Sequence, residues 1–523
     1  MKNVSIFAGH DANIAFADTD NDTYHVIEIE RLVKKRYFRL HVDNSMEDIY
    51  AILSACQNVA KQYFGMDDEY DVFSMPADGG LIPLDLIQQI FPFKEMTTFD
   101  HHRCHAASTF YQSPFKRSLI ISYDGGGNDG FFNVYLGDSD GINFLKNIKC
   151  DFGGGYLLLG SCCEEIGKSS RHQLALAGKF MGLGAYGDHD DEVISAMKPF
   201  FIDKDYKKLS DALPYDLKNA DCPWQNPLEN YKFSDKDSFD FAASAQLAYE
   251  AKFLELFDDI LKEYPLTNVC LTGGGALNVL LNQTIKNNYD VETFVSPNPN
   301  DGGLALGSLF LTSPPKKQVN IAYNGLPLLD ADKESEYLKD RKTSPLDLDY
   351  VCKLLKEGKI IGVCRGDSEV GPRALGNRSI VCDPSFKDMK DILNAKVKFR
   401  EWFRPFAPFC LKDEAHKYFE SADFENLEFM SYAPMVREEF QESLPSITHI
   451  DGTSRLQTVT EDSHQFFHDL LKTFSKYSDI NVLLNTSFNI RGNPILSTIE
   501  DALHVLDNTE LDCVIIDDTL VEK

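Results

Sequence analysis

The chain has 523 residues and carries 81 Asp and Glu against 52 Lys and Arg, which gives a formal net charge of −29 at pH 7. Hydrophobic residues make up 43% of the sequence and aromatic residues 12%, so the composition supports packed cores and excludes disordered, collagen-like and coiled-coil chains. The apolar runs are far shorter than the roughly 20 residues that cross a bilayer, and no signal peptide is recognisable. We therefore expect a cytoplasmic protein of roughly two to four domains, without a membrane partner.

The predicted elements alternate between strands and helices. Residues 4–20 predict two strands around a glycine turn, and residues 45–65 predict a helix because apolar side chains recur about every 3.6 positions. A strand pair around a glycine cluster follows at 117–141, a long amphipathic helix at 239–264, and a strand, glycine loop and helix at 268–287. This alternation predicts α/β domains.

A change of composition marks a connection between two domains. From Leu311 to about Asp349 the sequence has a proline pair and mixed charge but no sustained apolar period. We expect a first domain over residues 1–320, a linker over 321–348 and a second α/β domain over 349–523.

A histidine-rich segment points to a metal site. His101 and His105 are four residues apart, so on a helix they share one face, whereas His102 points elsewhere. Asp124 and Asp301 each follow a predicted strand, where α/β sheets place ligands. Two imidazoles and two carboxylates suit Fe²⁺, Mn²⁺ or Zn²⁺. The alternative is a solvated or capping histidine pair with two ordinary Asp–Gly turns.

Glycine clusters after apolar strands predict close approach of a phosphate to the backbone. The candidate nucleotide-binding residues are Gly125, Gly126, Gly127, Lys179, Gly273, Gly274, Gly275 and Asn278. Tight turns alone explain most such clusters. Two strand–glycine units in one chain nevertheless match the two-lobed ATPase logic of the actin, sugar-kinase and Hsp70 superfold, which is an analogy of fold and not of reaction.

Two short windows are basic in this acidic chain. Their cations are Arg365, Arg373, Arg378, Lys396, Lys398, Arg400 and Arg404. Aromatic and proline residues lie between them, so the segment is too hydrophobic to be fully solvated and predicts a partly buried anion site. The alternative is a surface ion-paired with Glu369 and Glu401. Nucleic acid is a possible partner, although the overall charge does not indicate it.

These segments together resemble the O-carbamoyltransferases of the nodulation-protein and cephamycin-biosynthesis type. The similarity covers essentially the whole chain. The matching segments are GHDANIAF, DHHRCHAAS, YDGGGNDG, GKFMGLGAYG, TGGGALN, NPNDGGLALG, EVGPRALGNRSI, VKFREWFRPFAP, DGTSRLQTV and NTSFNIRGNP. The sequence departs from the family pattern at Ser368 and Val370, where relatives often have Met and Phe.

The resemblance implies an actin-like ATPase superfold in the N-terminal domain and a carbamoyl-adenylate synthase fold (YrdC-like) in the C-terminal domain. It implies that carbamoyl phosphate and ATP with Mg²⁺ give carbamoyl-adenylate in the C-terminal domain. An acceptor hydroxyl is then carbamoylated beside a metal, usually iron, in the N-terminal domain. The acceptor is left open among a small natural product, a sugar and a hydroxymethylated nucleotide or DNA base. A homodimer is also expected by resemblance.

The resemblance also assigns residues. His101, His105, Asp124 and Asp301 match the metal ligands, and His10 matches a general base for the acceptor hydroxyl. The expected carbamoyl phosphate and adenylate pocket consists of Arg373, Lys398, Arg404, Arg455 and Asn485, with Lys398 also catalytic. The alternatives are a tRNA threonylcarbamoylation enzyme and a nucleotide-dependent binding protein without catalysis.

Overall fold

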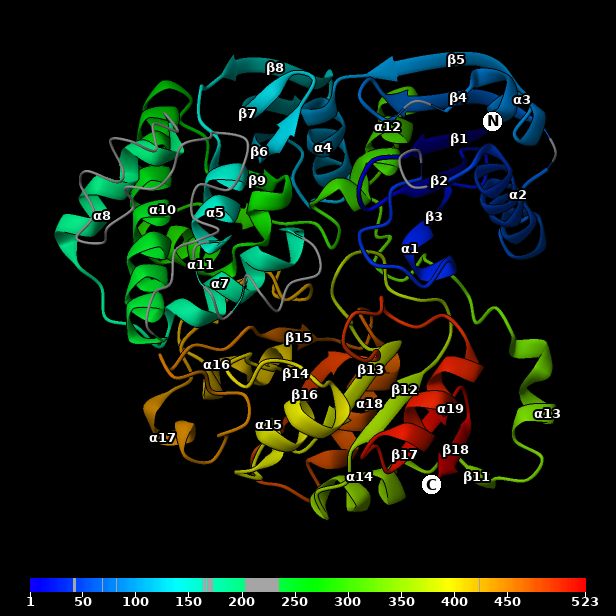
Figure 1. The fold of residues 1–523 in the computed structure, drawn as a ribbon, viewed down its shortest axis with the longest axis vertical. Coiled ribbons are helices and arrows are strands. Elements are labelled where there is room, and N and C mark those ends of the chain that lie inside the picture. The colour runs from blue at the N-terminus through cyan, green and yellow to red at the C-terminus, as the bar shows by residue number, and fades with distance from the viewer. Residues whose placement is uncertain are drawn as a thin grey trace.

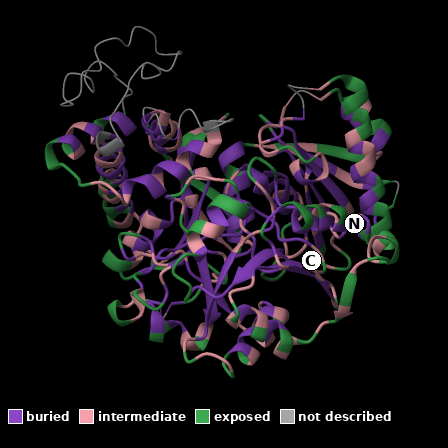
Figure 2. Ribbon diagram, turned by 60° about the horizontal axis from the view of Figure 1, so that its bottom comes forward, coloured by how far each residue is buried: buried purple, intermediate pink, exposed green. Residues whose placement is uncertain are grey.

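The computed structural model describes residues 1–40, 44–67, 69–80, 82–161, 163, 166, 173–202, 235–422 and 424–523. In this part of the chain the strands form three mixed sheets, two in the N-terminal portion and one in the C-terminal portion (Figure 1). The mixed α/β class predicted from the alternating pattern is confirmed. The strands are mainly buried, and the exposed surface lies largely on outer helices and loops (Figure 2).

The first sheet has the order β3-β2-β1-β4-β5. Its strands are β1 (Lys2–Phe7), β2 (Asn13–Asp18), β3 (Thr23–Glu28), β4 (Tyr70–Pro76) and β5 (Phe93–Phe99), accompanied by α1 (Ile29–Leu32), α2 (Met46–Tyr63) and α3 (Leu84–Ile90). Val4 and Ile6 of β1 pack in one core cluster with Leu53 of α2, whereas Phe7 packs in another with Leu306. Both faces of β1 are therefore covered. The helix predicted at 45–65 is confirmed as α2, which Ser45 begins with a capping box.

The second sheet repeats this topology in the order β8-β7-β6-β9-β10. Its strands are β6 (Ser118–Gly127), β7 (Gly130–Asp138), β8 (Gly141–Asn147), β9 (Asn268–Thr272) and β10 (Glu292–Phe294). In each sheet the first strand pairs antiparallel with the second and parallel with the fourth. The helices of this half are α5 (Phe152–Ser161), α7 (Leu176–Gly184), α8 (Asp191–Met197), α10 (Asp235–Glu263) and α11 (Val279–Asn288).

Helices α4 (His101–Phe110) and α12 (Leu304–Thr312) lie between the two sheets (Figure 1). They pack closely at Gly307, where an added Cβ would lie 1.9 Å from the carbonyl oxygen of Cys104. Because α4 carries the two candidate metal histidines, this close contact fixes their place relative to the first sheet.

The C-terminal sheet has the order β11-β18-β17-β12-β13-β16-β14-β15. Its strands are β11 (Lys342–Pro345), β12 (Ile361–Cys364), β13 (Arg378–Cys382), β14 (Ala407–Leu411), β15 (Gln457–Val459), β16 (Val482–Ser487), β17 (Cys513–Ile516) and β18 (Thr519–Glu522). The helices are α13 (Glu334–Tyr337), α14 (Leu348–Lys356), α15 (Met389–Ile392), α16 (Ala415–Tyr418), α17 (Glu438–Gln441), α18 (Gln465–Phe474) and α19 (Ile499–Asn508). Short turns of other helix types lie at Gln173–Ala175, Lys198–Phe201, Gly274–Leu277, Asp301–Gly303, Ala331–Lys333, Leu393–Val397 and Lys412–Glu414.

The segment expected to link the domains contributes to the C-terminal sheet. Residues 342–345 form β11, which pairs antiparallel with β18. The domain limits at 320 and 349 stay a prediction. Among the described helices, none combines the length and the apolar character needed to span a membrane.

Gly307→Ala is expected to lower the melting temperature of the full chain, because overpacking a helix contact costs about 1–3 kcal/mol. The same change should weaken Mn²⁺ binding, since it displaces α4. Ser45→Ala is the control: it removes a cap worth about 1 kcal/mol and should leave Mn²⁺ binding unchanged. Thermal denaturation and Mn²⁺ titration measure both effects. Unchanged Mn²⁺ affinity in a folded Gly307→Ala protein would contradict the link.

Candidate metal centre and anion pocket

Four side chains from three elements meet at the ends of the two N-terminal sheets. The Nε2 atom of His105 lies 3.1 Å from Nε2 of His101, 3.1 Å from Oδ2 of Asp124 and 3.5 Å from Oδ1 of Asp301. One ligand atom from each of the four residues lies within 4.8 Å of all the others. The structure thus brings together the four residues predicted as metal ligands.

Local hydrogen bonds hold this geometry. The side chains of Asn128 and Asp129, in the turn after β6, accept hydrogen bonds from the backbone amides of His101 and His102 and so cap α4. At Gly127, an added Cβ would lie 2.7 Å from the ring of His101. The Oδ2 atom of Asp124 accepts a 2.7 Å hydrogen bond from the amide of Gly274. The second glycine cluster therefore helps to orient a candidate metal ligand.

The donor set fits a divalent ion. Metal–nitrogen and metal–oxygen bonds of about 2.0–2.2 Å place neighbouring ligands about 2.8–3.6 Å apart in octahedral or tetrahedral geometry. The measured separations of 3.1–3.5 Å around Nε2 of His105 lie in that range. In the metal-free chain, burial opposes charge on His105, but hydrogen bonds to Asp124 and Asp301 raise its pKa to about 9. A divalent cation would displace the proton of His105 and balance the charges of Asp124 and Asp301 in its place.

Two further groups surround the centre. His10 is about one-third exposed, and its Nε2 atom lies 3.3 Å from Oδ2 of Asp301 while its Nδ1 atom lies 3.2 Å from Asp11. Burial opposes its charge, but the charges of Asp301 and Asp11 raise its pKa to about 10. A cation bound by Asp301 would offset the charge of that carboxylate and so bring the pKa of His10 down. The structure thus places His10 beside the centre, as its predicted role requires.

Asp78 is a site residue that the sequence reasoning missed. Its Oδ2 atom lies 2.9 Å from Nδ1 of His101, where a carboxylate orients a ligand imidazole. Asp78 follows β4 and precedes a glycine pair, which is the same signal that identified Asp124 and Asp301. His102 points away from the centre, as predicted, and its ring contacts the hydroxyl of Ser122 and the carbonyl of Gly130.

The two glycine clusters lie in different local structures: the first ends a strand, and the second begins a turn. Gly125, Gly126 and Gly127 belong to the end of β6 and not to the turn itself. Gly273 adopts a φ of +88°, and its amide donates to the carbonyl of Pro299 in the loop before Asp301. Asn278 is the N-cap of α11, and its side-chain amide pairs with that of Gln246. The strand, loop and helix predicted at 268–287 are confirmed.

Lys179 lies at the other candidate site. It was grouped with the nucleotide residues, yet its Nζ atom forms a buried 2.9 Å ion pair with Glu401 of the second basic window. Glu401 is also 3.8 Å from Arg404 and 3.5 Å from Arg491. Lys179 therefore joins α7 to the rim of the C-terminal basic cluster.

The basic cluster contains arginines without partners. Arg373 and Arg455 have no hydrogen bond or ion pair with any residue that the structure describes. Burial, followed by the charge of Arg404, lowers the pKa of Arg373 to about 10. Burial and the charges of Arg373 and Arg404 hold the pKa of Arg455 well below its usual range. Three neighbouring guanidinium groups with so little compensation make this a candidate anion pocket.

Lys398 and Asn485 shape this pocket differently. The ammonium of Lys398 is buried and donates to the carbonyl and side-chain oxygens of Ser487 and Asn489, so its donors are occupied. The side-chain amide of Asn485 donates to Ala374 and Gln457, and its Oδ1 atom is a buried acceptor without a described partner. Lys398 thus fixes the end of β16, and Asn485 offers one free acceptor.

Two cations of the basic windows serve the fold. Arg378 is fully buried and donates to backbone carbonyls of Arg365, Gly366 and Asn377, while Arg365 binds the turn at Asp517–Asp518. Neither adds a free charge to the pocket. Glu369, considered as an ion-pair partner, binds backbone amides instead.

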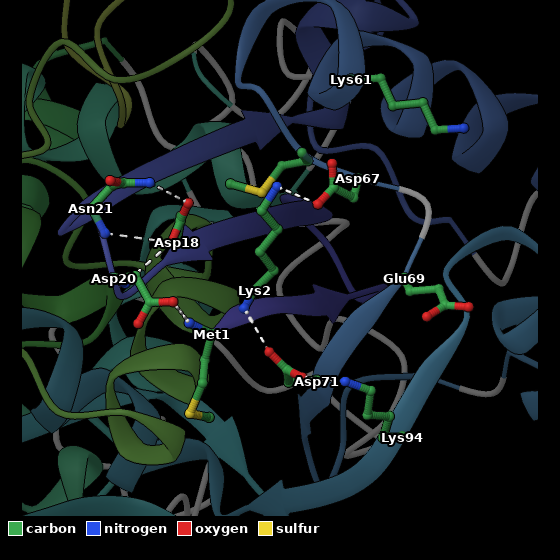
Figure 3. Close-up of a pocket in the computed structure, with 11 residues that line it drawn as sticks. Met1, Lys2, Asp18, Asp20, Asn21, Lys61, Asp67, Glu69, Asp71 and Lys94 are labelled. Carbon is green, nitrogen blue, oxygen red and sulfur yellow. Dashed lines mark hydrogen bonds and ion pairs between the residues drawn. The ribbon is translucent and has the colours of Figure 1, made fainter.

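A separate hollow of about 810 Å³ lies at the N-terminus of β1 (Figure 3). Ion pairs join the terminal amine to Asp20, Lys2 to Asp67 and Lys94 to Asp71. The hollow contains none of the candidate site residues, and we assign it no ligand.

Known families and proteins show similarity to this chain. The model "Carbamoyltransferase N-terminus" matches residues 12–309, and "Carbamoyltransferase C-terminus" matches residues 352–523. Nodulation protein NolO of Bradyrhizobium diazoefficiens is 32% identical over 81% of this chain and 79% of its own length. Nodulation protein NolNO of Sinorhizobium fredii is 31% identical over 86% of this chain and 68% of its own length.

Solved structures are more distant. Full-length HypF in a phosphate- and nucleotide-bound form aligns over 60% of this chain and 55% of its own, with 13% identity and a TM-score of 0.34. The (R)-2-hydroxyglutaryl-CoA dehydratase component A of Acidaminococcus fermentans covers 59% of this chain and 96% of its own, with 14% identity and a TM-score of 0.35. Scores this low carry no argument.

His105→Ala is expected to abolish stoichiometric divalent-metal binding, because Nε2 of His105 is the atom nearest to the other ligands. His102→Asn is the matched control on the same helix and should bind metal as the parent does. Equilibrium dialysis with Fe²⁺, Mn²⁺ and Zn²⁺, followed by metal analysis, gives the stoichiometry. Equal metal content in the two variants would rule out the assigned ligand set.

Proposed function

Since the chain belongs to the carbamoyltransferase family, we propose that it transfers a carbamoyl group from carbamoyl phosphate to an acceptor hydroxyl, through carbamoyl-adenylate made with ATP. The observation that carries this proposal is the pair of arginines, Arg373 and Arg455, which have no partner among the described residues and lie beside a buried acceptor on Asn485 that also lacks one there. A ligand with both anionic oxygens and an amide fits this combination, and carbamoyl phosphate has both.

The C-terminal pocket is the proposed place of activation. Water converts carbamoyl phosphate to carbamate and phosphate, and the carbamate oxygen attacks the α-phosphate of ATP, which releases pyrophosphate. Arg373, Arg404 and Arg455 balance the anionic charge of the reactants, and Oδ1 of Asn485 accepts from the carbamoyl NH₂. Lys398 acts here by holding Ser487 and Asn489 in place, a narrower role than direct catalysis.

The N-terminal centre is the proposed place of transfer. His101, His105, Asp124 and Asp301 would hold the divalent ion, with Fe²⁺ favoured over Mn²⁺ and Zn²⁺, and the bound ion would supply Lewis acidity toward the carbamoyl carbonyl. His10 would accept the proton of the acceptor hydroxyl as the new C–O bond forms and AMP leaves. Exclusion of water along this route limits hydrolysis of the adenylate.

The finer fold and partner assignments belong to the same proposal. The repeated topology of the two N-terminal sheets supports a two-lobed, actin-like ATPase fold, with the glycine clusters near the adenosine phosphate. We assign the eight-stranded C-terminal domain to the YrdC-like class by family resemblance. The acceptor is a small-molecule or nucleotide alcohol, and the assembly is a homodimer; both assignments rest on family resemblance alone.

Incubation with carbamoyl phosphate and ATP–Mg²⁺ is expected to give AMP and pyrophosphate. Arg455→Ala should lower this activity about 10²–10³-fold, or about 3–4 kcal/mol in the barrier, because it removes one group that balances the anionic charge. Arg341→Ala, which removes a surface ion pair with Asp507, is the control. Formation of ADP instead of AMP would exclude carbamoyl-adenylate as the intermediate. A strict need for threonine would favour threonylcarbamoylation, and nucleotide binding without turnover would favour a binding protein.

His105→Ala is expected to separate the two half-reactions. AMP and pyrophosphate should still form, since the anion pocket is intact, whereas transfer to the acceptor should fall to background. Labelled carbamoyl phosphate and cell extract supply the acceptor, and mass spectrometry identifies the labelled product in the parent reaction. Transfer at the parental rate by His105→Ala would refute the role given to the metal centre.

A further inference from the structure

Arg373 stands on a loop that both domains hold. On its C-terminal side, Oε1 of the buried Glu369 accepts hydrogen bonds of 2.8–3.1 Å from four consecutive backbone amides. These are the amides of Leu375, Gly376, Asn377 and Arg378. The side chain of Asn485 adds a bond to the carbonyl of Ala374. All of these anchors belong to the C-terminal domain, so they fix only the half of the loop that follows Arg373.

The other half of the loop is held by α1 and β3 of the N-terminal domain. The guanidinium of Arg31 donates to the carbonyl of Glu369 at 2.5 Å and to that of Gly371 at 2.7 Å. Arg31 also pairs with Glu28 at 2.6 Å, and Glu28 accepts a 3.3 Å bond from the amide of Gly371. The Arg31 side chain is only 2% exposed, so the pair is screened little by solvent. We call Glu28 and Arg31 the clamp.

The clamped loop lies directly against the loop that carries a metal ligand. Gly371 has a φ of +105°, and an added Cβ there would lie 2.1 Å from the carbonyl oxygen of Pro297. Pro297 is four residues before Asp301, and Pro299 accepts from Gly273. The contact between Gly371 and Pro297 therefore lies two residues before Arg373 and four residues before Asp301. A shift of either loop moves the contact that they share.

We propose that Arg31, with Glu28, is a positioning residue that sets the Arg373 loop against the Asp301 loop, so that metal binding and carbamoyl phosphate binding strengthen each other. This inference rests on the proposed function. Because the clamp makes the two loops move together, the loop position that favours metal binding is also the one that favours carbamoyl phosphate binding. The coupling between the two binding free energies is reciprocal. The geometry of a buried, multiply bonded guanidinium suits registry between two elements.

A second ion pair between the domains supplies the matched control. Lys34, three residues after Arg31, lies 2.8 Å from Asp501 of α19, and both side chains are well exposed, at 51% and 30%. It joins the same two domains, but among the described residues Lys34 makes no side-chain hydrogen bond or ion pair with the Arg373 loop. If the contact between the domains as a whole carried the Mn²⁺ effect, removal of either ion pair would reduce it. If the position of the Arg373 loop carries the effect, only a change in the clamp reduces it.

The experiment is calorimetric titration of the full chain with carbamoyl phosphate, without ATP, in metal-free buffer and with saturating Mn²⁺. The parent is expected to bind about tenfold more tightly with Mn²⁺, within the usual range of coupling between sites. Arg31→Lys keeps the charge but cannot hold two carbonyls and Glu28 together, so it should lose most of that difference. Lys34→Ala should keep it. Melting temperatures confirm that both variants are folded.

Each outcome decides a separate point. Equal affinity with and without Mn²⁺ in the parent would overturn the coupling and leave the proposed function standing. The same Mn²⁺ effect in Arg31→Lys as in the parent would remove the clamp from the account. An undiminished effect in His105→Ala would show that Mn²⁺ acts on the ligand and not through the centre, which also overturns the coupling. Absence of carbamoyl phosphate binding under both conditions would overturn the proposed function itself.

Discussion

Concentration of like charge at two enclosed places is the constraint on which this structure depends. Asp124 and Asp301 lie beside two imidazoles in the N-terminal domain. In the C-terminal domain, burial and the charge of Arg404 lower the pKa values of Arg373 and Arg455. Protonated histidines compensate the two carboxylates in the metal-free chain, whereas the arginines have little compensation, and burial of uncompensated charge is costly. The two sites therefore favour ligands of opposite sign, a cation in one case and an anion in the other. The proposed carbamoyl transfer, which begins with an anionic donor and ends beside a metal, would use both.

Backbone contacts keep these charges in place. The turn after β6 caps α4, Gly274 holds Asp124, and Glu369 gathers four amides behind Arg373. Close approaches at Gly307 and Gly371 leave no room for a side chain. The sites thus rest on elements that cannot shift independently, which is what preorganised electrostatic catalysis requires.

Local patterns predicted the parts of the site that depend on spacing along one element. The four-residue interval between His101 and His105 fixes a shared helix face, and a strand end followed by Asp–Gly identified Asp124 and Asp301. The same rule, applied once more, finds Asp78. This rule could not identify Arg31, because nothing in the sequence distinguishes a single arginine after a strand from a surface cation. Its position follows only from contacts with the C-terminal domain. The basic windows pointed to an anion site, yet they could not separate Arg373, which has no partner among the described residues, from Arg378, whose donors bind backbone carbonyls.

The amino-acid sequence by itself determined the alternation of strands and helices, the candidate metal-ligand set and the family, because each depends on periodicity or on motifs within short segments. Tertiary structure decided which cations stay unpaired, that Lys398 is held by Ser487 and Asn489, that Lys179 lies by Glu401, and that the Arg373 and Asp301 loops touch. Those facts arise from contacts between residues distant in the chain, and the balance of burial and pairing at such contacts leaves no periodic trace in the sequence.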